Sequence, residues 1–214
     1  MGSVVNVARR LAKNRLLAHL TADVVLFGNF TKAVLKIPKD NFLMVGRRWD
    51  LKVNGEIDFN DDWEKKLQER LKKEGKLHGL SGMDYFVFPK DALGEFPPFI
   101  IGSPASDNWV VYKARAVGLP VIDATEEVTA VHQDHDRPRK NSDFYKFEKQ
   151  RNIELAGGSN FMCSLQDADW ILTKEGLKKP PFPRIIFSKL TLFKPWRYLI
   201  TLKRQIQNYF RMGY

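Results

Sequence analysis

The sequence contains a single cysteine, Cys163, among its 214 residues. One thiol excludes an intrachain disulfide and any metal site built from several cysteines, so we expect a reducing compartment and a buried thiol. No run of about 18 apolar residues is present, which excludes a membrane-spanning helix. Basic side chains interrupt the apolar positions of residues 1–19, so we expect no signal peptide there.

The sequence also lacks a P-loop, the glycine pattern of dinucleotide-binding proteins and a Gly-x-Ser-x-Gly elbow. Residues 176–214 contain no acidic side chain but nine basic ones, so they supply most of the net charge of +10. Because the rest of the chain is nearly neutral, we expect no specific nucleic-acid partner. We divide the chain into an active domain over 1–175 and a basic segment over 176–214.

Residues 195–211 place apolar side chains near one face of a helix, with basic side chains between them. This pattern predicts either binding to an anionic membrane surface or docking on the domain's own core. A membrane contact would suit a cytoplasmic protein that works at the inner membrane face.

Short apolar runs alternate with segments of helical periodicity along the first 155 residues. The patterns predict helices over 4–17, 31–36, 61–74 (with Asn60 as N-cap), 107–117 and 143–155, and strands over 22–27, 41–45, 84–88, 120–122 and 128–131. This alternation predicts a layered α/β domain.

Asp23 stands at the start of a predicted strand. A carboxylate inside the apolar run would be costly, so we expect Asp23 at the strand end, beside a partner. Ligands collect at strand ends in open α/β sheets, and a carboxylate there suits a divalent metal that carries phosphates. The alternative is that Asp23 caps a helix or a turn.

Two imidazoles and two carboxylates follow another predicted strand, in the stretch Val-His-Gln-Asp-His-Asp at 131–136. His132 and His135 can face one metal ion across a turn, and mixed nitrogen and oxygen ligands suit manganese or another borderline divalent ion. Zinc is disfavoured because no third strong ligand stands at a recognisable zinc spacing. The alternative is a solvated polar loop.

Asp107 opens the predicted helix 107–117, after a loop shaped by glycine and proline. A carboxylate at the mouth of a sheet can act as a general base that deprotonates an acceptor hydroxyl. The alternative is a structural role, as the N-cap or as an acid in the first turn, where the helix dipole favours negative charge.

Arg47 and Arg48 follow a predicted strand, and Trp49 and Asp50 come directly after them. Two guanidinium groups can hold phosphate oxygens, and Trp49 offers a flat apolar face to a sugar ring. Asp84, at the start of a further strand, can bond sugar hydroxyls or complete a turn. Surface arginines are common, so a structural role is the alternative for this group.

As an ordered set, these segments resemble a family of bacterial-type glycosyltransferase-like proteins with the GT-A fold of nucleotide-diphospho-sugar transferases. The resemblance covers about residues 20–175. Six stretches carry it: Thr-Ala-Asp-Val at 21–24, Phe-Leu-Met-Val-Gly-Arg-Arg-Trp-Asp at 42–50, Gly-Met-Asp-Tyr-Phe-Val-Phe-Pro at 82–89, Asp-Asn-Trp at 107–109, Val-Ile-Asp-Ala-Thr at 121–125 and Val-His-Gln-Asp-His-Asp at 131–136.

The resemblance implies a mixed, mostly parallel sheet flanked by helices, and it does not extend over the basic helical segment that follows. It also implies metal-dependent transfer of a sugar from a nucleotide-sugar donor to a hydroxyl of a glycan or a lipid-linked acceptor.

The resemblance also implies roles for the candidate residues. Asp23 is similar to the last acid of the family's strand-end metal motif, and His132 or His135 to the histidine that completes the shell of manganese or magnesium. Asp107 is similar in placement to the carboxylate that activates the acceptor in inverting members. The pocket for sugar and acceptor would be lined by Arg47, Arg48, Trp49, Asp50, Asp84, Asn108 and Trp109.

Two features depart from the family's pattern. The acidic pair of the metal motif is reduced to Thr-Ala-Asp at 21–23, so one carboxylate must serve where many members have two. The elements that bind the nucleotide base normally precede this motif, whereas this sequence starts at the helix before it. We therefore expect that a partner or another chain supplies that half, that the chain is truncated, or that it no longer binds donor.

Two other functions stay open. One is a non-catalytic or partner-dependent protein that binds sugar nucleotides or polyanions; its binding would fall steeply with salt and survive loss of Asp23 and His132. The other is a metal-dependent phosphoester hydrolase that uses His132, Asp134 and His135.

Overall fold

The structure is a computed structural model that describes residues 1–60, 62–134 and 142–181. His135 and the segment 195–211 lie outside the described residues. The elements follow in the order α1 (Gly2–Leu11), β1 (Leu16–Leu20), β2 (Val24–Leu26), α2 (Asn29–Leu35), β3 (Leu43–Val45), β4 (Trp49–Leu51), α3 (Trp63–Glu74), β5 (Lys76–Leu77), β6 (Tyr85–Pro89), α4 (Ser106–Ala116), β7 (Val121–Asp123), β8 (Ala130–Gln133), α5 (Asp143–Leu155), a 3₁₀ turn (Leu165–Asp167), β9 (Trp170–Thr173) and β10 (Gly176–Lys178).

Within the described residues, these strands form two mixed sheets. The larger sheet has six strands in the order β1-β6-β3-β7-β9-β10, and the smaller has four in the order β2-β8-β4-β5. The α/β class is therefore confirmed.

The prediction of a mostly parallel arrangement is wrong, because five of the eight pairings among these strands are antiparallel. Three of those five involve strands that the sequence patterns did not predict. One of them, β9–β10, is closed by a turn too short to join parallel strands.

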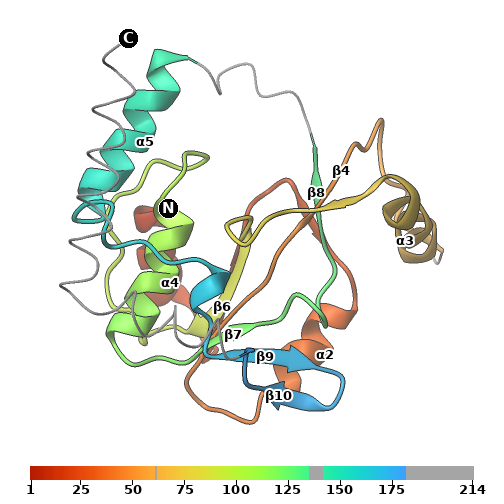
Figure 1. The fold of residues 1–214 in the computed structure, drawn as a ribbon, viewed down its shortest axis with the longest axis horizontal. Helices are drawn as coiled ribbons and strands as arrows, with labels where there is room; N and C mark the ends of the chain where they lie inside the picture. Colours follow the sequence, from red (N-terminus) through yellow and green to blue (C-terminus); the bar gives the residue numbers. More distant parts are fainter. Residues whose placement is uncertain (61, 135–141, 182–214) are drawn as a thin grey trace.

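The larger sheet separates two apolar layers, and alternate residues of its strands face each layer. In β3, Leu43 and Val45 face the layer that contains α1 and α4, whereas Met44 faces the layer that contains α2. The smaller sheet packs against α3 through a third cluster that includes Leu51 and Leu67. In Figure 1, α3 lies beyond β4 and β8, on the side of the molecule away from α4 and α5.

The helix predicted over 4–17 is wrong beyond residue 11. Ala12 leaves α1 with extended backbone angles, and Leu16–Leu20 forms β1, which pairs antiparallel with β6. Asn60 does not cap α3, which begins at Trp63; its side-chain Oδ1 instead accepts a hydrogen bond from the Asp62 N–H at 3.2 Å. The prediction that Cys163 is buried is confirmed.

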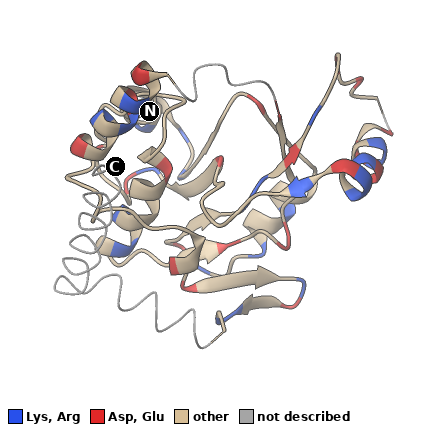
Figure 2. Cartoon of the chain, turned by 45° about the horizontal axis from the view of Figure 1, so that its top comes forward, with Lys and Arg blue, Asp and Glu red and all other residues tan. Residues whose placement is uncertain are grey.

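Lys and Arg alternate with Asp and Glu along the described part of the chain, for example in α3 (Figure 2). In this part of the chain, no helix combines the length and the apolarity needed to span a membrane. The predicted domain boundary at 175/176 falls inside the β9–β10 hairpin, because β10 begins at Gly176 and pairs with β9.

Candidate functional site

Four polar side chains form a row across the smaller sheet. Asp23 directly precedes β2, His132 lies in β8, Asp50 lies in β4, and His78 directly follows β5. We refer to Asp23, His132, Asp50 and His78 as the cross-strand row. The strand register creates it: Asp50 is the direct partner of His132, and the Asp23 carbonyl accepts a hydrogen bond from the Gln133 N–H at 2.9 Å.

Carboxylates and imidazoles alternate along the cross-strand row. His132 Nε2 lies 3.2 Å from Asp23 Oδ2, and His132 Nδ1 lies 3.5 Å from Asp50 Oδ1. His78 Nδ1 lies 2.6 Å from Asp50 Oδ2. The His132 side chain is only 1% exposed, whereas Asp23 and His78 at the two ends are 34% and 38% exposed. The row therefore crosses a buried region and meets solvent at both ends.

Arg48 connects the cross-strand row to Asp84. Its Nε donates to Asp50 Oδ1 at 2.8 Å, and its Nη1 donates to Asp84 Oδ1 and Oδ2 at 2.9 and 2.7 Å. Burial raises the pKa of Asp50, but hydrogen bonds from His78 and Arg48 outweigh burial and hold that pKa below its usual value. Asp50 is therefore the anionic centre of this cluster.

Asp107 lies in the first turn of α4, close enough to Asp84 and Arg48 for their charges to affect it. Burial, followed by the negative charge of Asp84, raises the pKa of Asp107 to about 7. The Ser106 hydroxyl, whose Oγ is 3.3 Å from Asp107 Oδ1, and the charge of Arg48 oppose this rise. A carboxyl group that titrates near neutral pH is suited to accept a proton from a substrate hydroxyl.

The local backbone excludes Asp107 as the N-cap of α4. That position is held by Ala105, and no side chain caps the helix. Ala105 has a φ of 89°, the left-handed region that non-glycine residues rarely adopt. Such strain persists only where surrounding contacts impose it.

Asn152 of α5 supplies these contacts for the loop before α4. Its completely buried side chain accepts a hydrogen bond from the Ile100 N–H at 2.8 Å. It also donates to the carbonyls of Ile100, Ser103 and Pro104 at 3.1–3.2 Å. The loop that leads to Asp107 is therefore held by a helix far along the sequence.

Several residues predicted to line the pocket have structural roles. Trp109 is buried in the core between Phe96 and Phe99, with ring centroids 5.3 Å apart in both pairs, so this side chain packs in the core and does not face a substrate pocket. Asn108 donates from its side chain to the Cys163 carbonyl at 2.7 Å, which fixes the loop beside α4.

The other members of the predicted pocket surround the cross-strand row. Trp49 packs partly buried against the core between the smaller sheet and α3. Arg47 donates from Nη1 to the His78 carbonyl at 3.3 Å. The guanidinium of Arg48 is engaged by two carboxylates of the protein, Asp50 and Asp84, rather than directed outward for phosphate.

The 3.2 Å between Asp23 Oδ2 and His132 Nε2 is the distance of a direct hydrogen bond or ion pair, and it also fits two neighbouring ligands of a divalent cation. Two neighbouring ligands of an octahedral ion, each about 2.1 Å from it, lie about 3 Å apart, close to the 3.2 Å between Asp23 Oδ2 and His132 Nε2. Two residues before Asp23 in the sequence, the buried hydroxyl of Thr21 has no hydrogen-bond partner among the described residues.

These described residues include no set of three His, Cys, Asp or Glu side chains arranged around a metal. The fit is therefore to an ion that two side chains hold and that takes its other ligands from water or from substrate phosphates.

His78 was not predicted as a site residue, and no local motif marks it. Leu77 pairs with Trp49 across β4 and β5, and this long-range pairing carries His78 to Asp50. Of the predicted residues, the structure brings together Asp23, His132, Asp50, Arg48, Asp84 and Asp107.

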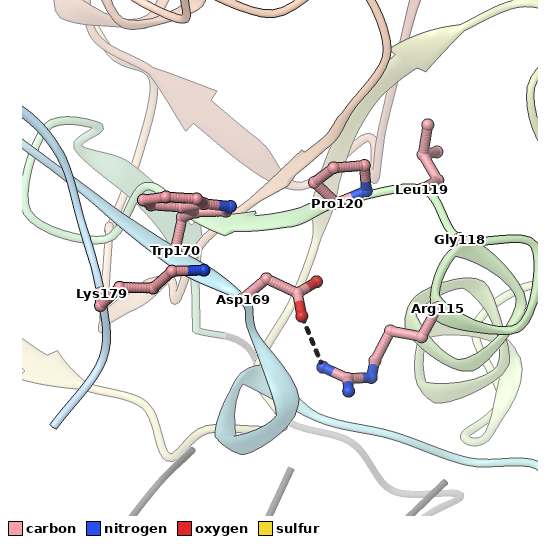
Figure 3. Close-up of a pocket in the computed structure, with 7 residues that line it drawn as sticks. All are labelled: Arg115, Gly118, Leu119, Pro120, Asp169, Trp170 and Lys179. Atoms are coloured by element: carbon pink, nitrogen blue, oxygen red, sulfur yellow. Dashed lines mark hydrogen bonds and ion pairs between the residues drawn. The ribbon is translucent and has the colours of Figure 1, made fainter. Parts of the chain in front are cut away.

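A pocket of about 280 Å³ lies elsewhere, at the starts of β7 and β9, and Figure 3 shows its lining. Arg115 Nη1 lies 3.2 Å from Asp169 Oδ1, and Lys179 Nζ lies 3.6 Å from the centroid of the Trp170 ring. Because the cross-strand row and Asp107 do not line this pocket, it is not where the candidate groups converge.

Comparison with known protein families, with curated proteins and with solved structures finds no match to this chain.

Proposed function

We propose that this chain is a divalent-metal-dependent glycosyltransferase of the GT-A type, which transfers a sugar from a nucleotide-sugar donor to a hydroxyl group of an acceptor. One observation carries the proposal: Asp23 and His132, from distant segments, meet at 3.2 Å, and the Arg48–Asp84 pair connects their row to Asp107. A metal-facing pair at one end of a charged cluster and a titrating carboxyl group at the other match the two tasks of such a transfer.

Asp107 is the general base in this proposal. The bond between the anomeric carbon and the diphosphate oxygen breaks, a bond from the acceptor oxygen to that carbon forms, and Asp107 takes the hydroxyl proton. A pKa of about 7 allows Asp107 to exist as a carboxylate at neutral pH and still hold the proton that it receives.

Asp23 and His132 would hold the cation, manganese or magnesium, and a cation bound there would neutralise the charge of the leaving diphosphate. His135, outside the described residues, stays an alternative to His132. Arg48 holds Asp84 and Asp50 in place through hydrogen bonds of 2.7–2.9 Å. We therefore assign the phosphate contact to Arg47 rather than to Arg48.

A binding measurement followed by a transfer assay tests the proposal. We expect nucleoside diphosphates or nucleotide sugars to raise the melting temperature only with manganese or magnesium present. Asp23→Ala and His132→Ala should each abolish this shift, whereas Asp58→Ala, which removes an exposed acid outside the cross-strand row, should leave it intact. In the transfer assay, the wild-type protein incubated with a labelled nucleotide-sugar donor and an acceptor should then release nucleoside diphosphate.

Two results would overturn the transferase assignment. Binding that persists in Asp23→Ala and His132→Ala and falls steeply with salt would indicate a polyanion-binding protein. Metal-dependent release of inorganic phosphate from phosphoesters, without sugar transfer, would indicate a hydrolase.

A further inference from the structure

At one exposed end of the cross-strand row, a histidine and a carboxylate are in close contact. His78 Nδ1 lies 2.6 Å from Asp50 Oδ2, and Asp50 Oδ1 accepts a hydrogen bond from Arg48 Nε at 2.8 Å. Both oxygens of Asp50 are therefore engaged within the protein, which argues against the substrate-binding role that the sequence suggested for Asp50. The side chain of His78, in contrast, is 38% exposed.

The contact with Asp50 determines which nitrogen of His78 carries the proton. Burial raises the pKa of Asp50, but hydrogen bonds from His78 and Arg48 hold that pKa below its usual value, so the carboxylate is ionised at neutral pH. An ionised carboxylate only accepts hydrogen bonds, so in the neutral His78 ring the proton lies on Nδ1 and the lone pair on Nε2. No described residue forms a hydrogen bond or an ion pair with this Nε2.

Both the backbone and the ring of His78 are fixed by neighbouring groups. Its N–H donates to the Arg48 carbonyl at 2.9 Å, and its carbonyl accepts a hydrogen bond from Arg47 Nη1 at 3.3 Å. The ring lies directly against Gly82, where an added Cβ would be 2.3 Å from His78 Cδ2. Because the ring cannot turn without losing its contact with Asp50, Nε2 is held in one direction.

We propose that His78 is a substrate-binding residue whose Nε2 accepts a hydrogen bond from a hydroxyl group of the sugar acceptor. This inference deepens the proposed function and rests on it. A lone pair binds a hydrogen-bond donor, which every sugar hydroxyl is, whereas an ionised phosphate offers only acceptor oxygens. Asp50 is then the positioning residue that orients this ring.

The position of His78 in the smaller sheet favours the acceptor over the donor diphosphate. His78 follows β5, and β5 is two strands away from β8, which contains His132. Because neighbouring strands are about 4.8 Å apart, the two residues are about 10 Å apart across the sheet. A group bound at His78 is therefore a different part of the substrate from the diphosphate assigned to Asp23 and His132.

Two substitutions of His78 separate substrate binding from a purely structural role. In His78→Asn, the amide nitrogen is as many bonds from Cβ as Nδ1 is, so it can still donate to Asp50, but no atom replaces Nε2. In His78→Gln, the amide oxygen is as many bonds from Cβ as Nε2 is, so it can replace that acceptor. Lys76→Ala, an exposed change in β5, is the matched control.

Acceptor kinetics at pH 8 test the proposal, with manganese, a saturating nucleotide sugar (UDP-glucose, UDP-galactose or GDP-mannose) and the methyl glycosides of glucose, galactose and mannose as acceptors. His78→Asn should raise the acceptor KM by about 3- to 10-fold, the loss of one hydrogen bond, and leave kcat nearly unchanged. His78→Gln should restore part of the loss, and Lys76→Ala should not change KM. Hydrolysis of the donor without acceptor should be the same in all of these proteins.

An unchanged acceptor KM in folded His78→Asn would overturn this inference and leave the proposed function in place. Donor hydrolysis by the wild type without transfer to any of the three glycosides would do the same. If the wild type neither binds nor hydrolyses a nucleotide sugar with manganese, the proposed function fails, and this inference fails with it.

A measurement on the wild type decides if His78→Asn does not fold. Diethyl pyrocarbonate modifies the lone pair of an accessible imidazole, and mass spectrometry of peptides gives the rate for His78 alone. A saturating acceptor glycoside should slow this modification at least about threefold, because the sugar hydroxyl occupies Nε2. Equal rates with and without the glycoside would overturn the inference.

Discussion

At the scale of single residues, the environment that raises the pKa of Asp107 favours its proposed role as a base but lowers the stability of the folded protein. Burial and the charge of Asp84 raise its pKa from the ordinary 3.8 to about 7. Between these two values the folded protein binds more protons than the unfolded chain does. Stability contributed by this group is therefore lost as the pH rises from about 4 to about 7.

Asp107→Asn should stabilise the protein, and more at pH 8 than at pH 5. The amide has nearly the same shape and cannot ionise, so the cost of holding a partly buried carboxylate disappears. A pKa difference of one corresponds to about 1.4 kcal/mol, which sets an upper limit of about 4 kcal/mol at pH 8. Urea unfolding at both pH values measures the change in the free energy of unfolding. Equal values for the two proteins at pH 8 would show that the ionised Asp107 does not destabilise the fold.

The same substitution should remove the chemistry while it preserves binding. If Asp107 is the base, Asp107→Asn lowers turnover by about 100- to 10,000-fold and leaves donor affinity unaltered. In the wild type, turnover should rise as the pH increases through about 7, because only the carboxylate accepts the proton. Steady-state rates between pH 5.5 and 8.5 test both points, and a rate independent of pH would remove Asp107 from this role.

Gly82→Ala should destabilise the protein and displace the His78 ring. The new methyl group would meet His78 Cδ2 at 2.3 Å and His78 Cβ at 2.7 Å. Overpacking of this kind typically costs about 1–3 kcal/mol. Gly79→Ala, in the same loop, is the matched control, since no atom lies within 4 Å of its added Cβ. Equal unfolding free energies for the two variants would mean that the loop yields to the methyl group.

At the scale of elements, α5 controls the geometry of a site that it does not itself form. Asn152 makes all of its described side-chain hydrogen bonds to the backbone of the loop before α4. The exact placement of Asp107 therefore depends on a residue outside the charged cluster.

Asn152→Ala should lower the unfolding free energy by about 2–4 kcal/mol, because it leaves buried backbone groups without partners. It should also reduce turnover, since the loop that carries Asp107 loses its support. Gln150→Ala, an exposed change on the same helix, should alter stability by about 0.5 kcal/mol or less. Denaturant unfolding of both variants decides; a loss as small as that of Gln150→Ala would show that water replaces the Asn152 contacts.

Local patterns predicted the helices better than the strands. The helix expected over 143–155 matches α5, whose side-chain cap Ser142 accepts a hydrogen bond from the Tyr145 N–H at 3.2 Å. In contrast, β5 has two residues and β4 has three, too few for an alternating pattern to appear. These strands exist because a distant partner satisfies their backbone groups, and one sequence does not reveal that partner.

For the candidate site, local sequence patterns likewise predicted some residues and missed those that depend on strand pairing. Asp23 and His132 each stand beside an apolar run that marks a strand, so their placement at strand ends could be inferred. The role of Asp50 could not, because it depends on the pairing of β4 with β8 and on His78 from β5. Trp109 was misassigned because an aromatic residue after Asp107 gives no indication of which face of the helix is buried.

At the scale of the whole molecule, charge is divided unevenly along the chain. Residues 182–214 contain seven basic side chains and no acidic one, whereas basic and acidic residues are mixed on the described part (Figure 2). We propose that residues 195–211, whose sequence is basic and amphipathic, bind an anionic membrane surface. This contact would bring a lipid-linked acceptor to the site. A deletion that tests this proposal must leave β10 in place, because β10 pairs with β9.

A chain that ends at residue 181 should therefore fold and fail to sediment with anionic liposomes, whereas the full chain should sediment. Each basic residue near such a surface contributes about 1 kcal/mol, so changing Arg197, Lys203 and Arg204 together to Gln should weaken binding by more than about 100-fold. Neutral phosphatidylcholine liposomes are the control, and added salt should release the full chain from anionic ones because surface attraction is screened. Equal sedimentation of the full and shortened chains would exclude 182–214 as the membrane contact, and the segment would then act on the domain itself.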